Sequence, residues 1–179
     1  MSMAASPHRS DMARHAIIMG VAGCGKTSVG ESLSRRTGLG FVDGDALHPR
    51  ENVDKMSRGN PLTDADRWPW LEAVGRAFAQ SPAPLIIGCS ALKRSYRDRI
   101  RHHADAPVSF IHLTGSREVI GRRMRERRNH FMPPALLDSQ FTALEPPGAD
   151  EAAIAIDIDQ PLDAIVSRAA RYLEGQDHD

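Results

Sequence analysis

The chain has 179 residues, of which 41% are hydrophobic and 26% are charged, and its 23 Lys and Arg residues balance 23 Asp and Glu residues. This length indicates one domain large enough to bury a core, and the balanced charge excludes a global attraction to nucleic acid or to an anionic membrane. Two cysteines are too few for a disulfide framework and lack the spacing of zinc ligands.

The termini and the hydropathy pattern favour a single domain in a reducing compartment. No apolar run approaches the roughly 20 residues of a membrane span, and residues 1–14 lack the apolar segment of a signal peptide. We therefore expect tails at residues 1–14 and 176–179, and one domain over residues 15–175. We also expect a cytoplasmic protein without a membrane or nucleic-acid partner.

Strand and helix signals alternate along the chain. Apolar runs predict strands over residues 16–19, 39–42, 84–89, 108–113 and 154–158. Helical spacing, cap residues and prolines predict helices over residues 26–36, 49–56, 63–80, 91–103, 116–128, 134–144 and from residue 161 onward. This alternation predicts an α/β fold in which helices cover both faces of a parallel sheet.

Several helix ends carry local signals. Thr63 with Asp66 three residues later resembles a capping box. Ser90 and Ser116 are each expected to cap the helix that follows them, and Gly38 is expected to end the first helix.

A phosphate-binding loop (P-loop) follows the first strand. The segment Gly20, Val21, Ala22, Gly23, Cys24, Gly25, Lys26 and Thr27 matches G-x-x-x-x-G-K-[ST]. The glycines allow backbone N–H groups to converge on an anion, and the helix N-terminus adds its positive end. Lys26 is expected to reach the outer phosphates of ATP, and the Thr27 hydroxyl to bind Mg²⁺. Because the motif follows a strand and opens a helix, it predicts nucleotide binding.

Two acids, Asp43 and Asp45, end the second strand. Ligands in open α/β sheets lie beyond the carboxyl ends of the strands, so both acids are expected near the phosphates. One can join the Mg²⁺ shell while the other takes a proton from an acceptor hydroxyl. The alternative is a solvated Asp-Gly turn, and these residues alone do not divide the two roles.

Arginines crowd residues 117–128, before a break at residues 129–134. Like charges at this density repel one another on a helix, so the cluster is either a solvated face, an RNA-binding surface or a lid whose arginines clamp a phosphoryl group. No RNA-binding motif accompanies the cluster, which favours the lid.

A second group of basic residues lies between the second strand and the helix after the third, namely Arg50, Arg58, Arg67, Lys93 and Arg97. Arginine forks suit a carboxylate or phosphate on an acceptor, and the alternative is ordinary surface charge. The chain lacks the Asn-Lys-x-Asp motif of GTPases and is too short for a motor. Among the classes of nucleotide-binding enzyme, these absences leave a small phosphotransferase.

Longer blocks of the sequence resemble one family, the gluconate kinases of the short P-loop type. The matching blocks, spread over about residues 16–173, are Asp43–Pro49, Asn52 with Lys55–Met56, Gly59–Leu71, Cys89–Lys93, Tyr96–Asp98, His130–Met132, Ser139–Glu145 and Asp157–Pro161. The resemblance implies transfer of phosphate from ATP to the 6-hydroxyl of D-gluconate, with Mg²⁺. It also implies the fold of shikimate and nucleoside monophosphate kinases, with five parallel strands in the order 2-3-1-4-5 and an Arg-rich lid at about residues 122–140.

The resemblance also implies residue roles. Asp45 becomes the base, Asp43 joins Thr27 at the metal, and Lys26 stabilises the transferring group with Arg127 and Arg123. The residues that would hold the sugar acid are Asp45, His48, Arg50, Arg58, Lys93 and Arg97. Members are often dimers, so a homodimer is expected.

Two positions depart from the family pattern. Cys24 stands where Ser is usual, and a thiol at a helix N-terminus is prone to oxidation; we therefore expect a mild oxidant to inhibit the enzyme and ATP to protect it. Asn129 replaces a Gly before His130.

Two other classes remain open from the sequence. One is a kinase for another small acceptor, such as shikimate or a nucleotide. The other is a nucleotide- or RNA-binding protein without catalysis, for which strongly salt-dependent RNA binding would be the sign.

Overall fold

The computed structural model describes residues 14–127 and 134–176, and it contains one sheet of parallel strands. The strands lie in the order β2-β3-β1-β4-β5, as expected. They are β1 (His15–Met19), β2 (Gly40–Asp43), β3 (Leu85–Gly88), β4 (Val108–Thr114) and β5 (Ala153–Asp157). The central strands β1, β3 and β4 are almost entirely buried, which explains their continuous apolar runs.

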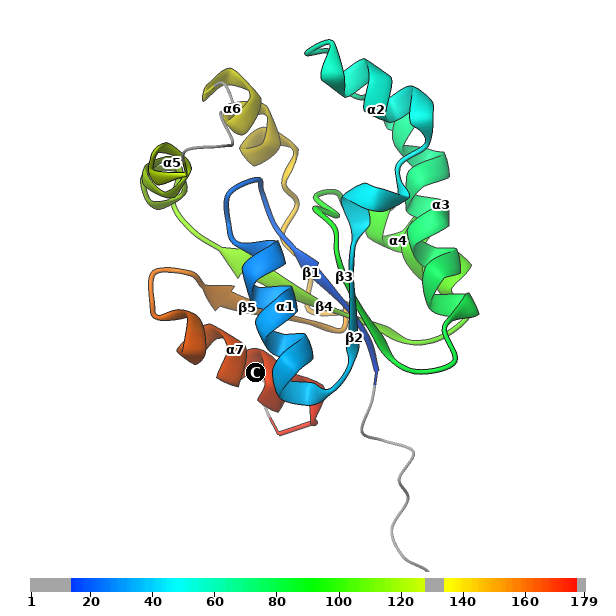
Figure 1. Cartoon of the computed structure of the whole chain (residues 1–179), viewed down its shortest axis with the longest axis vertical. Helices are drawn as coiled ribbons and strands as arrows, with labels where there is room; N and C mark the ends of the chain where they lie inside the picture. Colours follow the sequence, from blue (N-terminus) through cyan, green and yellow to red (C-terminus); the bar gives the residue numbers. More distant parts are fainter. Residues whose placement is uncertain (1–13, 128–133, 177–179) are drawn as a thin grey trace, which may run out of the picture.

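Helices cover both faces of this sheet (Figure 1). One face packs against α1 (Lys26–Thr37) and α7 (Leu162–Leu173), and the other against α3 (Asp64–Gln80) and α4 (Arg94–Ala104). Four further elements lie near the carboxyl ends of the strands, namely η2 (Gly44–Leu47), α2 (Arg50–Ser57), α5 (Arg117–Glu126) and α6 (Pro134–Ala143). The three-layer α/β fold predicted from the sequence is confirmed.

Local capping signals explain three of the helix ends. Thr63 and Asp66 form the expected capping box at the start of α3, and the Ser116 side chain accepts a hydrogen bond from the Val119 N–H at the start of α5. Gly38 ends α1 with φ at 77°, a left-handed conformation that glycine adopts without strain.

The expected cap at Ser90 is wrong. Helix α4 begins at Arg94 with Lys93 in the N-cap position, and Ala91 has φ at 45°, which no right-handed helix allows. The carbonyl groups of Ala91 and Leu92 instead accept hydrogen bonds from the Arg97 guanidinium, at 2.9 and 3.2 Å. Residues 90–93 therefore form a loop that α4 itself holds in place.

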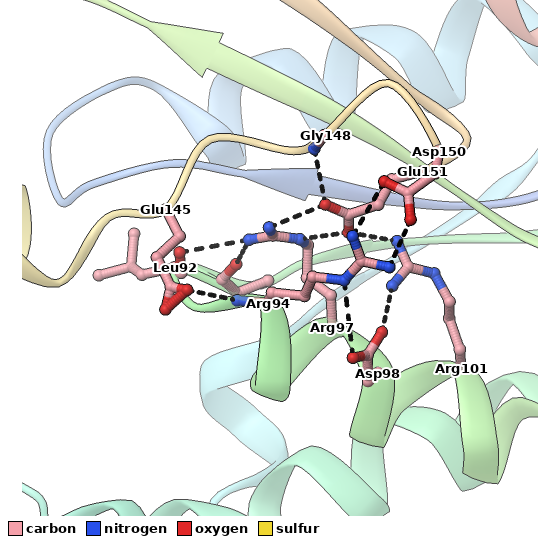
Figure 2. A network of polar contacts seen from close by, with 10 residues as sticks. Leu92, Arg94, Arg97, Asp98, Arg101, Glu145, Gly148, Asp150 and Glu151 are labelled. Atoms are coloured by element: carbon pink, nitrogen blue, oxygen red, sulfur yellow. Dashed lines mark hydrogen bonds and ion pairs between the residues drawn. The ribbon is translucent and has the colours of Figure 1, made fainter.

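Arg97 also forms a buried ion pair, so the structure corrects the expectation that it binds a sugar acid. Its side chain is 0% exposed and bonds to both carboxylate oxygens of Glu151, at 2.8 and 3.1 Å (Figure 2). Every part of the guanidinium thus faces protein groups, and none is available to a ligand.

The Glu151 carboxylate accepts several of the hydrogen bonds in this network. Burial by itself would raise the pKa of Glu151, but hydrogen bonds from Arg97, Arg101 and the Gly148 N–H hold that pKa at about 2. The carboxylate therefore stays ionised at neutral pH and joins α4 to the segment before β5.

Some expectations fall outside the described residues. They concern the N-terminal tail up to residue 13, the last residues of the chain, and the break in the basic segment over 129–133. Within the described ranges, no helix is long and apolar enough to cross a membrane.

We expect Arg97→Met to lower the free energy of unfolding by about 3–5 kcal/mol, because it leaves a buried carboxylate without its main partner. Arg101→Met is the matched control: it removes a half-buried arginine from the same carboxylate and should cost about 1 kcal/mol or less. Urea denaturation at pH 7 measures both values. Equal losses in the two variants would show that the buried Arg97 contributes no more to the free energy of unfolding than the half-buried Arg101.

Candidate active site

Three loops meet at the carboxyl edge of the sheet. They follow β1 (residues 20–25), β2 (residues 43–47) and β3 (residues 89–93). Because β3 lies between β1 and β2, its loop touches both neighbours. The Gly20 N–H donates to the Ser90 carbonyl at 3.3 Å, and a Cβ atom on Gly44 would lie 2.3 Å from the Gly88 carbonyl oxygen. The P-loop and the acids after β2 thus flank one shared strand.

The P-loop has the backbone of an anion site. Gly23 and Gly25 have φ at 82° and 95°, which side chains with a Cβ adopt poorly. A Cβ on Gly23 would also lie 2.6 Å from Met124 Cγ, because α5 packs against the loop. The loop leads directly into α1, a 12-residue helix whose N-terminal N–H groups and dipole favour an anion.

Lys26 folds back over the P-loop. Its Nζ donates to the carbonyls of Gly20 and Val21, at 3.0 and 3.1 Å. Thr27 is the next residue and is exposed. The Gln140 side chain on α6 accepts a hydrogen bond from the Ala22 N–H at 2.7 Å. This contact ties α6 to the loop.

Cys24 does not have the exposure that its oxidation would require. It is 1% exposed and belongs to the core cluster between the sheet, α1 and α7. Its sulfur packs so close to Gly20 that a Cβ there would lie 2.7 Å from it. The structure therefore opposes the expectation of a readily oxidised thiol, and its role in the loop rests on its backbone.

Asp43 and Asp45 differ in surroundings. The Asp43 side chain accepts a hydrogen bond from the Asp45 N–H at 3.0 Å and so caps η2. The protein around the Asp45 carboxyl desolvates it and raises its pKa, the negative charge of Asp43 adds to this, and the Lys26 ammonium opposes it. A raised pKa makes Asp45 a better proton acceptor when it is ionised.

The donors at this edge fit a magnesium–nucleotide complex. Thr27 offers a hydroxyl and Asp43 a carboxylate, which are the oxygen ligands that Mg²⁺ prefers. Among residues 14–127 and 134–176, no group of three or more His, Cys, Asp or Glu residues is arranged to hold a metal.

The loop after β3 carries Lys93 toward α3. Its Nζ lies 3.3 Å from Oδ2 of Asp64, and the Tyr96 hydroxyl donates a hydrogen bond to Oδ1 of the same carboxylate. Arg50 and Arg58 stand at the two ends of α2, are exposed, and make no ion pair with any described residue. These two cations are therefore free to meet an anionic ligand.

His48 lies between η2 and α2. Its ring stacks on Trp70 with the centroids 4.1 Å apart, and the indole N–H of Trp70 donates to the Gly44 carbonyl at 2.9 Å. His48 is thus tied to the turn that carries Asp45.

The arginines of α5 divide into two sets. Arg123 reaches over the P-loop: its Nη1 lies 4.0 Å from the Cβ position of Gly25, and its Nη2 donates to the Ile158 carbonyl. Arg127 is exposed at the end of the helix. Arg117 and Arg122 instead form ion pairs with Asp138 and Asp159, at 2.7 and 4.0 Å.

Most of the predicted site residues thus gather at one edge of the sheet, and Arg97 does not. Sequence reasoning assigned no role to four residues that support this edge: Asn52, Asp64, Trp70 and Gln140. All four stand in blocks that carry the family resemblance, which was the one available signal.

Comparisons with known proteins agree with this geometry. A family model described as "AAA domain" matches residues 16–147. A protein named gluconokinase from Gluconobacter oxydans is 42% identical over 167 residues, which cover 92% of this chain and 93% of that protein. The crystal structure of a gluconokinase from Sinorhizobium meliloti is 46% identical with a TM-score of 0.81, over 93% of this chain and 99% of that one.

A more distant likeness concerns the fold alone. The shikimate kinase of Bacteroides thetaiotaomicron is 17% identical, with a TM-score of 0.65, over 90% of this chain and 98% of that one.

We expect Asp45→Asn to raise the melting temperature at pH 7. Because the pKa of Asp45 lies higher in the folded chain than in the unfolded one, its ionised form destabilises the fold at neutral pH. The gain should vanish as the pH falls below the ordinary range of a carboxyl group, where both states are protonated. Thermal melts across pH measure this difference, and an unchanged or lower melting temperature at pH 7 would contradict it.

Proposed function

The chain belongs to the gluconokinase family, and we propose on that premise how this ATP-dependent kinase phosphorylates gluconate. The γ-phosphoryl group of ATP moves to the 6-hydroxyl of D-gluconate and gives 6-phosphogluconate and ADP. One observation carries this proposal: the P-loop and Asp45 flank β3 at the carboxyl edge of the sheet, beside the loop that carries Lys93. This arrangement supports an acceptor site next to the site of the phosphate donor.

The P-loop holds the phosphates of ATP. Backbone N–H groups of the loop, among them those of Gly23 and Gly25, supply donors together with the N-terminus of α1. Lys26 exchanges its bonds to the loop carbonyls for the outer phosphates, where its charge stabilises the negative charge that spreads over the transferring group. Arg123, above Gly25, and Arg127 act on the same charge from α5.

Asp45 orients the acceptor hydroxyl and takes its proton. The raised pKa supports this role, because the carboxylate then holds a proton more readily than an ordinary aspartate does. His48, Arg50, Arg58 and Lys93 bind the sugar acid, and the unpaired cations of Arg50 and Arg58 suit its carboxylate.

Thr27 and Asp43 would hold Mg²⁺, the ion implied for this family. When bound, the ion neutralises charge on the phosphates. The contribution of the protein is to fix the two oxygen ligands, since Asp43 is held by its bond to the Asp45 N–H.

The setting of the enzyme completes the proposal. We infer that it is cytoplasmic, works without nucleic acid and forms a homodimer, with one kinase domain over residues 15–175 and a lid at about residues 122–140. The balanced charge and the family resemblance support these statements.

Turnover with a panel of acceptors tests the proposal. Magnesium-ATP is supplied with gluconate, related sugar acids, glucose, shikimate or nucleoside monophosphates, and ADP release is measured. We expect turnover with gluconate. Efficient turnover with another acceptor and none with gluconate would keep the P-loop assignment and overturn the acceptor site.

We expect Asp45→Asn to lower kcat about 10²–10⁴-fold, the range for loss of a general base, while the variant stays folded. Asp105→Asn is the matched control. It makes the same change in the left-handed C-cap of α4, a conformation that Asn tolerates, and it should leave kcat unchanged. Near-normal kcat in Asp45→Asn would exclude Asp45 as the base.

A further inference from the structure

The ring of His48 is held in a fixed orientation. It stacks on Trp70 with an interplanar angle of 16°, and Trp70 is itself buried and anchored to the Gly44 carbonyl. Gly44 directly precedes Asp45, so this stack keeps the imidazole next to the proposed base. What the ring can do then depends on which of its nitrogens carries a proton.

Asn52 determines which ring nitrogen of His48 carries the proton. Its side chain is buried, and its Nδ2 lies 2.8 Å from the main-chain oxygen of Asp66 and 3.3 Å from Nδ1 of His48. A carbonyl oxygen only accepts, so the bond to Asp66 fixes Nδ2 of the amide on that side. The second hydrogen of the same Nδ2 then points to His48. Nδ1 of His48 must therefore act as an acceptor.

A ring that accepts at Nδ1 carries its proton at Nε2. Burial, followed by the positive charge of Arg67, lowers the pKa of His48 to about 4, so the ring is neutral at pH 7. A neutral imidazole has one N–H group, which leaves Nε2 as the donor. Among the residues that the structure describes, none accepts a hydrogen bond from that nitrogen.

We propose that Asn52 is a positioning residue that holds His48 in the Nε2–H tautomer, so that Nε2 donates a hydrogen bond to an oxygen of the sugar acid. This inference rests on the proposed function. The opposite tautomer would turn a lone pair toward that oxygen. A carboxylate oxygen could then form no hydrogen bond with the ring, and a hydroxyl could form one only by donating its own proton. Neither a hydroxyl nor a carboxylate oxygen needs a charged partner here, because a neutral N–H serves both.

The tautomer can be observed directly in the wild-type chain. Nitrogen-15 NMR of the full-length, histidine-labelled protein at pH 7 distinguishes a protonated from an unprotonated ring nitrogen, and the spectrum of His48→Gln identifies the His48 signals. We expect an unprotonated Nδ1 and a protonated Nε2. A protonated Nδ1 in the wild type would overturn the inference, and this measurement needs no variant of Asn52.

Asn52→Asp tests the cause. A carboxylate at this position accepts rather than donates, so it should draw the proton of the neutral His48 ring from Nε2 to Nδ1. The KM for gluconate should then rise about tenfold, the loss expected for one hydrogen bond at a buried site. The KM for ATP should change less than twofold. Asn60→Asp makes the same exchange at an exposed asparagine after α2 and should change neither value. An unchanged His48 tautomer in Asn52→Asp would contradict the role of Asn52.

Two substitutions of His48 separate its nitrogens. A Gln amide nitrogen reaches about where Nε2 lies, whereas an Asn amide nitrogen reaches about where Nδ1 lies, and both variants lose the stack on Trp70. His48→Gln should therefore keep a KM for gluconate about tenfold lower than that of His48→Asn. Equal KM values would show that the donor at Nε2 has no role in binding.

The outcomes separate the inference from the proposed function. If the wild type phosphorylates gluconate and carries its proton on Nδ1, the function stands and the inference fails. If the wild type has the Nε2–H form and does not phosphorylate gluconate, the proposed function fails, and with it the role of Nε2 as a donor to a sugar acid.

Discussion

The position of β3 between β1 and β2 is the constraint on which the site depends. Parallel pairing aligns the carboxyl ends of these three strands, so the P-loop, the acids after β2 and the loop carrying Lys93 open at the same edge. The contact is close enough that Gly44 has no room for a side chain against the Gly88 carbonyl. A phosphate donor bound after β1 and an acceptor bound after β2 therefore meet over one strand.

Buried side chains supply part of the support around this edge. The Arg97–Glu151 pair holds the carbonyls of Ala91 and Leu92, and the next residue along that loop is Lys93. Trp70 holds the carbonyl just before Asp45. In both cases a buried side chain binds the main chain of a site loop. These bonds fix the backbone next to Lys93 and next to Asp45. The surroundings of the Asp45 carboxyl raise its pKa, which favours its role as a proton acceptor.

The sequence predicts the sheet, the P-loop and most helix ends because their signals are local. Apolar runs, the Gly-Lys-Thr ending of the P-loop and the Thr63 capping box each lie within a few residues. The misassignments have distant causes. Ser90 is a residue type that often caps helices, but the Arg97 guanidinium donates to the carbonyls of Ala91 and Leu92 and so holds this segment as a loop. Arg97 looks like a ligand for a sugar acid, but its partner Glu151 stands 54 residues away. The contact between Gln140 and Ala22 joins positions 118 residues apart, and no local sequence pattern predicts it.

The central claim is that the acceptor's 6-hydroxyl lies opposite the P-loop, next to Asp45. Proton-coupled phosphorus-31 NMR of the product made from magnesium-ATP and gluconate tests this claim most directly. Phosphate on the primary 6-oxygen couples to the two protons of that carbon and gives a triplet, which is the result we predict. A doublet, from phosphate on a secondary oxygen, or an uncoupled acyl phosphate signal would contradict the placement of the acceptor.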